Sequence, residues 1–74
     1  MAGVEKIIEK MIHRPNGVRF REIAKVLEHH GYIEVRVSGS HHHFRNRKGD
    51  LITIPNHNPI KAVYVKDVLR RIGR

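Results

Sequence analysis

Cysteine is absent from this chain of 74 residues, and the chain contains no long apolar run. The lack of cysteine excludes disulfide frameworks, thiolate nucleophiles and cysteine-ligated zinc sites. The longest strongly apolar run, residues 51–54, contains a threonine, and charged side chains interrupt the first apolar stretch. Neither a secretory signal peptide nor a membrane span fits these patterns, so we expect a cytoplasmic protein that does not associate with membranes.

Acidic side chains are also scarce, and the shortage lies in the C-terminal half. Residues 1–35 hold six Lys or Arg against five Asp or Glu, a balance of +1. Residues 36–74 hold nine against two, a balance of +7. A surface of that sign attracts polyanions, and phosphate backbones are the usual target. The charge therefore favours a nucleic acid as ligand.

Hydrophobic periodicity divides the chain into helical and extended segments. Apolar residues at helical spacing predict helices over about residues 3–13 and 19–30 and a last helix that ends near residue 72. Ile33, Val35 and Val37 alternate with polar residues, which predicts a strand with one buried face. Further strands are expected over residues 41–46 and 51–54. The order α-α-β-β-β-α predicts one α+β domain, a two-layer sandwich with helices on one face of a three-stranded antiparallel sheet.

Three consecutive histidines follow a Gly-Ser turn, in the run Gly-Ser-His-His-His-Phe over residues 39–44. Histidine titrates near neutrality, so it can accept and return a proton at cellular pH. Successive strand side chains point to opposite faces, so His41, His43 and Arg45 share one face. His42 shares the other face with Phe44, the large apolar residue of the run. We therefore expect His42 to pack inward and His41 and His43 to face solvent.

Three sequence segments together resemble the HicA family of toxin ribonucleases: the run over residues 39–44, the strand end Ile-Pro-Asn-His over 54–57, and the terminal helix over 65–73. The resemblance covers about residues 19–73, so we expect a single HicA-like domain over 1–74 with residues 1–18 as an extra N-terminal helical extension. Residues 61–64, Lys-Ala-Val-Tyr, are bulkier than the small-residue turn of the family.

The resemblance implies a fold like that of the double-stranded-RNA-binding domain. It also implies an endoribonuclease that cleaves mRNA without a metal or other cofactor, and a HicB-type antitoxin as inhibitor. The histidine directly after the Gly-Ser pair, His41, would be catalytic. In this hypothesis His41 deprotonates a ribose 2′-hydroxyl for attack on the adjacent phosphorus. His57 is the candidate acid for the leaving oxygen, and His43 is a possible accessory residue that would contact RNA.

Cations for binding RNA and stabilising phosphoryl charge are expected on the predicted hairpin, as Arg45, Arg47 and Lys48. The chief chemical alternative is a zinc site formed by His41, His43 and His57. Acidic residues that would support such a site are few after residue 34.

Two other functions remain open from the sequence. A non-catalytic RNA-binding module of the same fold would bind RNA in a salt-sensitive manner without cutting it. A helix-turn-helix over residues 4–30 would bind DNA, but this region is nearly neutral. The chain has two tyrosines and two phenylalanines, so we expect little stacking on bases.

Overall fold

The computed structural model describes residues 3–74 and has the predicted order of elements. The strands form one antiparallel sheet in the order β1-β2-β3, which confirms the α+β class. The elements are α1 (Val4–His13), a 3-10 turn (Pro15–Gly17), α2 (Phe20–His29), β1 (Ile33–Ser38), β2 (His41–Arg45), β3 (Leu51–Pro55) and α3 (Ala62–Arg71).

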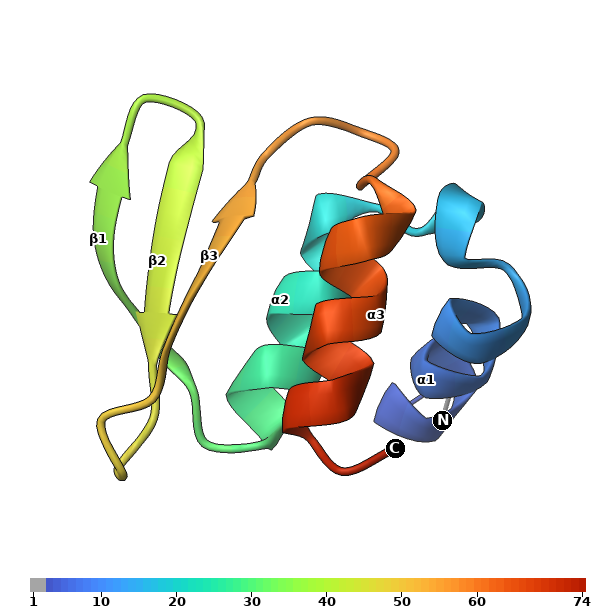
Figure 1. Ribbon diagram of the computed structural model, residues 1–74, viewed down its shortest axis with the longest axis horizontal. Coiled ribbons are helices and arrows are strands. Elements are labelled where there is room, and N and C mark those ends of the chain that lie inside the picture. The colour runs from blue at the N-terminus through green and yellow to red at the C-terminus, as the bar shows by residue number, and fades with distance from the viewer. Residues whose placement is uncertain (1–2) are drawn as a thin grey trace.

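The helices lie on one side of the sheet, in two successive layers. Figure 1 shows α2 and α3 against the sheet, with α1 on the far side of these two helices. The predicted sandwich is confirmed for the sheet with α2 and α3, and α1 adds a third layer. Two residues of the predicted N-terminal extension, 1 and 2, lie outside the described residues. No helix of residues 3–74 is long and apolar enough to cross a membrane.

The hydrophobic core fills the space between the sheet and α2 and α3 and continues to α1. Each helix contributes residues at spacings of three and four, because these fall on one helical face. The sheet contributes Phe44 from β2 and two isoleucines from β3. The buried side chains of these elements are Ile8, Met11, Ile23, Val26, Leu27, Phe44, Ile52, Ile54, Val65, Val68 and Leu69.

The prediction of a buried face on β1 is wrong. Ile33, Val35 and Val37 are 64%, 48% and 50% exposed. The register shifts between Glu34 and Arg36, so a bulge at Val35 breaks the alternation. Ile33 therefore pairs with Arg45, whereas Val37 pairs with His42 on the opposite face. The strand is also at the edge of the sheet, and none of its side chains enters the core.

Ion pairs fasten α1 to the rest of the domain. The Lys10 ammonium lies 2.9 Å from a Glu22 carboxylate oxygen on α2, and Arg74 pairs with Glu5. Partial burial raises the pKa of Glu22, but hydrogen bonds from the Arg19 N–H and from Lys10 outweigh this effect and hold that pKa below its usual range. The extra helix is thus joined to the domain by apolar packing and by charge.

Candidate active site

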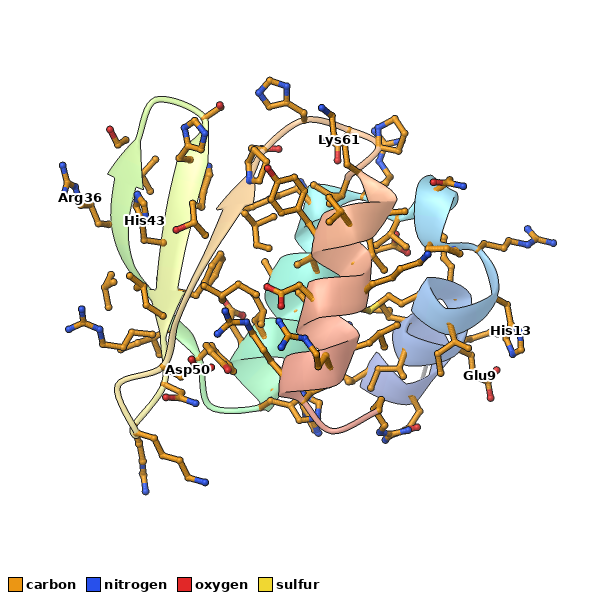
Figure 2. The ribbon with its side chains drawn as sticks, in the orientation of Figure 1. Glu9, His13, Arg36, His43, Asp50 and Lys61 are labelled. Atoms are coloured by element: carbon orange, nitrogen blue, oxygen red, sulfur yellow. The ribbon has the colours of Figure 1, made fainter. Side chains whose placement is uncertain are left out.

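The three histidines of β2 have three different environments. His42 faces the helices, where its Nδ1 lies 2.5 Å from a Glu34 carboxylate oxygen and its ring centroid 4.5 Å from that of Phe20. The expectation that His42 packs inward beside Phe44 is confirmed. His43 lies on the outer face of the sheet, and its Nδ1 is 2.8 Å from the Thr53 hydroxyl. Figure 2 shows His43 near Arg36 on the side away from the helices.

His41 is exposed and lies at the first position of β2, directly after the turn that joins it to β1. Gly39 in this turn has a φ of +61°, a conformation that glycine adopts without strain. At this end of the sheet, β3 ends and α3 begins. A pocket of about 310 Å³ opens there, lined by Ser40, His41, Pro55, His57, Lys61 and Tyr64. The lining contains no carboxylate, so the pocket is suited to an anionic ligand.

His57 reaches the same pocket because its loop is held at two points. On one side, the Asn56 N–H donates to the Ser40 carbonyl oxygen at 2.7 Å, and His57 Nε2 lies 3.1 Å from the Ser40 hydroxyl. On the other side, the Phe20 N–H donates to the Asn58 side-chain oxygen at 2.7 Å. The structure therefore brings together His41 and His57, the two histidines expected to act as base and acid.

The cations of the hairpin lie at the opposite end of β2 from this pocket. Arg45 is four residues beyond His41, and a strand rises about 3.3 Å per residue, so their backbones are about 13 Å apart. Arg47 and Lys48 lie in the following turn, beyond Arg45. The structure does not bring these three cations to the reacting phosphate expected beside His41. Arg36 and His43, paired across β1 and β2, lie between the two ends of the sheet.

Lys61 is the cation at the pocket itself, and it was not among the residues that the sequence singled out. Figure 2 places it at the start of α3, at the end of the domain where the pocket opens. Tyr64, one turn further along α3, was missed as a site residue in the same way. The sequence signal was the bulky segment 61–64, whose position beside the histidines depends on the path of the loop after β3.

A hydrogen-bonded network joins the turn of the β2–β3 hairpin to α3. The Tyr32 hydroxyl donates to Asp50 at 2.5 Å, and Arg71 donates to the other oxygen of Asp50 at 2.7 Å. These hydrogen bonds, from Tyr32 first and Arg71 second, hold the pKa of Asp50 below its usual range. Burial, together with the hydrogen bond to Asp50, raises the pKa of Tyr32. The hairpin that carries Arg47 and Lys48 is thus held by a structural ion pair.

The arrangement of histidines does not correspond to the zinc site considered as an alternative. Within residues 3–74, no group of three His, Asp or Glu side chains is placed to hold a metal ion. His43 is directed to Thr53 on the outer face, whereas His41 and His57 line the pocket at the end of the sheet.

These features define a small basic α+β domain with a histidine pocket at one end of its sheet. A family model described as the HicA toxin of bacterial toxin-antitoxin systems matches residues 20–73. The chain therefore belongs to the HicA toxin family. Membership of this toxin-antitoxin family implies an antitoxin partner. The match begins after α1. Comparison with curated proteins and with solved structures finds no match.

Proposed function

We propose that the protein is a metal-independent endoribonuclease that cleaves mRNA and is neutralised by a HicB-type antitoxin. The observation that carries the proposal is the pocket in which His41 and His57 meet with Lys61 and without a carboxylate. A base and an acid on opposite sides of one phosphate are what cleavage at a ribose 2′-hydroxyl requires.

In the proposed reaction, neutral His41 takes the proton of the 2′-hydroxyl, and the 2′-oxygen attacks the adjacent phosphorus. The bond from phosphorus to the 5′-oxygen of the next nucleotide breaks, leaving a 2′,3′-cyclic phosphate. Protonated His57 gives its proton to the leaving 5′-oxygen. Lys61 offsets the charge that develops on the phosphoryl oxygens. DNA lacks the 2′-hydroxyl and would not be cut.

Ser40 supports this scheme as a positioning residue. Its carbonyl oxygen and hydroxyl hold the loop that carries His57, and it is the residue directly before His41 in the chain. One turn therefore sets the positions of both histidines. Because an error of about 1 Å in a reacting group can cost about 100-fold in rate, this attachment matters for catalysis.

The test compares purified wild-type protein with His41→Ala on single-stranded RNA, with His13→Ala as matched control. His13 is an exposed histidine on α1, far from the pocket (Figure 2). We expect His41→Ala to lower the cleavage rate by about 100-fold or more, and His13→Ala to leave it unchanged. A 2′-deoxy substitution at the cut nucleotide should abolish cleavage there.

Three results would contradict the proposal or one of its assignments. RNA binding without cleavage by the wild type would favour the non-catalytic RNA-binding module. Loss of cleavage in chelator, with recovery on adding zinc, would favour a metal-dependent reaction. Wild-type activity of folded His41→Ala would refute the assignment of the base.

The outer face of the sheet supports an antitoxin as the protein partner. Its exposed apolar side chains Ile33, Val35 and Leu51 lie among cations such as Arg36 and Arg45. A protein with an acidic surface and apolar contacts would fit this face. If a small acidic protein is encoded beside this chain, its addition should abolish RNA cleavage; cleavage that persists in a stable complex would contradict neutralisation.

A further inference from the structure

The pocket beside His41 has an aromatic side chain that the reaction scheme does not use. Tyr64 is half-buried at the edge of the core and lines the pocket. The other three Tyr and Phe side chains are buried in the core or packed against a neighbouring ring. Tyr32 is 3% exposed and bonded to Asp50, Phe44 is 1% exposed, and Phe20 packs on the His42 ring.

The pocket is lined by two kinds of side chain. Tyr64 and Pro55 offer rings with apolar faces, whereas His41, His57 and Lys61 offer groups that suit a phosphate or a ribose hydroxyl. The volume of about 310 Å³ lies at the lower end of the range of about 300–1,000 Å³ that is usual for ligand pockets. Such a lining matches one nucleotide, with the base on the rings and the phosphate on the cations.

We propose that Tyr64 stacks on an unpaired base next to the phosphate that is cut, so that the substrate is RNA that is single-stranded at the cleavage point. In a duplex both faces of each base are covered by neighbouring bases, so the ring of Tyr64 has no free face to contact. This inference rests on the proposed function, because it places the base beside His41. The expectation of little stacking rested on the small number of aromatic residues, and the proposal requires the ring of only one of them.

The experiment measures binding of oligomers that cannot be cut. The probes are a fluorescent 2′-O-methyl oligoadenylate of twelve nucleotides and an abasic oligomer of the same length and charge. The variants are Tyr64→Leu, which keeps apolar volume in the core but removes the π face, and Tyr64→Phe, which keeps the ring. Val63→Ala is the matched control, because Val63 is the preceding residue of α3 and is 66% exposed. Circular dichroism establishes that each variant is folded.

We expect Tyr64→Leu to weaken binding of the base-bearing oligomer by about fivefold or more and to leave binding of the abasic oligomer unchanged. Tyr64→Phe and Val63→Ala should bind both oligomers as the wild type does. Equal weakening of both oligomers by Tyr64→Leu, or no weakening of either, would overturn the stacking.

Cleavage assays on the same variants separate this inference from the proposed function. If the wild type cuts RNA through His41 but Tyr64→Leu binds and cuts as well as the wild type, the stacking is refuted and the nuclease remains. If the base-dependent binding is lost in Tyr64→Leu but the wild type cuts no RNA, the stacking is supported and the nuclease is refuted.

Discussion

Truncation of Met11 measures how firmly α1, the helix outside the family match, is joined to the domain. Met11 on α1 is fully buried and belongs to the core that α1 shares with α2 and α3. Replacing such a side chain by alanine costs about 2–5 kcal/mol, from lost apolar burial and from the cavity that remains. A domain of this size has a total stability of roughly 4–11 kcal/mol, taking about 0.05–0.15 kcal/mol per residue. Met11→Ala should therefore remove a large part of the free energy of unfolding.

The assay is urea unfolding followed by circular dichroism, with Ile12→Ala as matched control. Ile12 is the next residue of α1 and is 49% exposed, so we expect its truncation to cost less than about 1 kcal/mol. In thermal unfolding, Met11→Ala should lower Tm by at least about 8 °C, since each kcal/mol corresponds to about 4–8 °C in a domain of this size. Equal urea midpoints for the two variants would refute the packing of α1 as a third layer.

Two further predictions concern the hairpin. Because the pKa of Asp50 is lowered in the folded state, its contribution to stability is present at neutral pH and is lost as the pH falls below about 5 and through that lowered pKa. Asp50→Asn should therefore lower the urea midpoint at neutral pH and flatten its decline in acid; an unchanged acid decline would contradict the network with Tyr32 and Arg71. Replacing Arg47 and Lys48 by glutamine should weaken RNA binding and reduce the salt slope by about 1.4, at about 0.7 for each phosphate contact. Since both lie far from His41, the single-turnover cleavage rate at saturating RNA should stay unchanged, and a large fall in that rate would contradict their separation from the chemistry.

The sequence predicts the order of the elements, but it predicts which side chains face the core for only some of the strands. The alternation along β2 correctly separated His42 from His41 and His43, because that strand pairs regularly on both sides. The same reasoning failed on β1, since a bulge at Val35 inserts one extra residue and the helices do not cover this edge strand. A bulge depends on pairing with a partner strand, so the local sequence pattern does not reveal it.

The pocket was only partly predictable. The motif over residues 39–44 identified His41 as a candidate site residue. Several of its neighbours in the pocket come from segments that are distant in the sequence. Lys61 and Tyr64 join it because the loop after β3 is tied to Ser40 and α2 and leads directly into α3. These contacts are long-range hydrogen bonds, and sequence spacing alone does not encode them.

Net charge predicted a polyanionic ligand but not where it would lie. Of the nine cations in residues 36–74, three form ion pairs within the domain: Arg70 with Asp67, Arg71 with Asp50 and Asp67, and Arg74 with Glu5. Acidic side chains of the domain already oppose these three charges. Six of the nine have no ion pair within residues 3–74. Five of these six follow a path from the hairpin across the sheet to the pocket: Arg47, Lys48, Arg45, Arg36 and Lys61. The sixth, Lys66, lies on α3. An RNA strand along this path would be held at the hairpin and cut at the far end of β2. Under the proposed function, an antitoxin that covered only the pocket would stop cleavage and would leave the cations of the hairpin free to bind RNA.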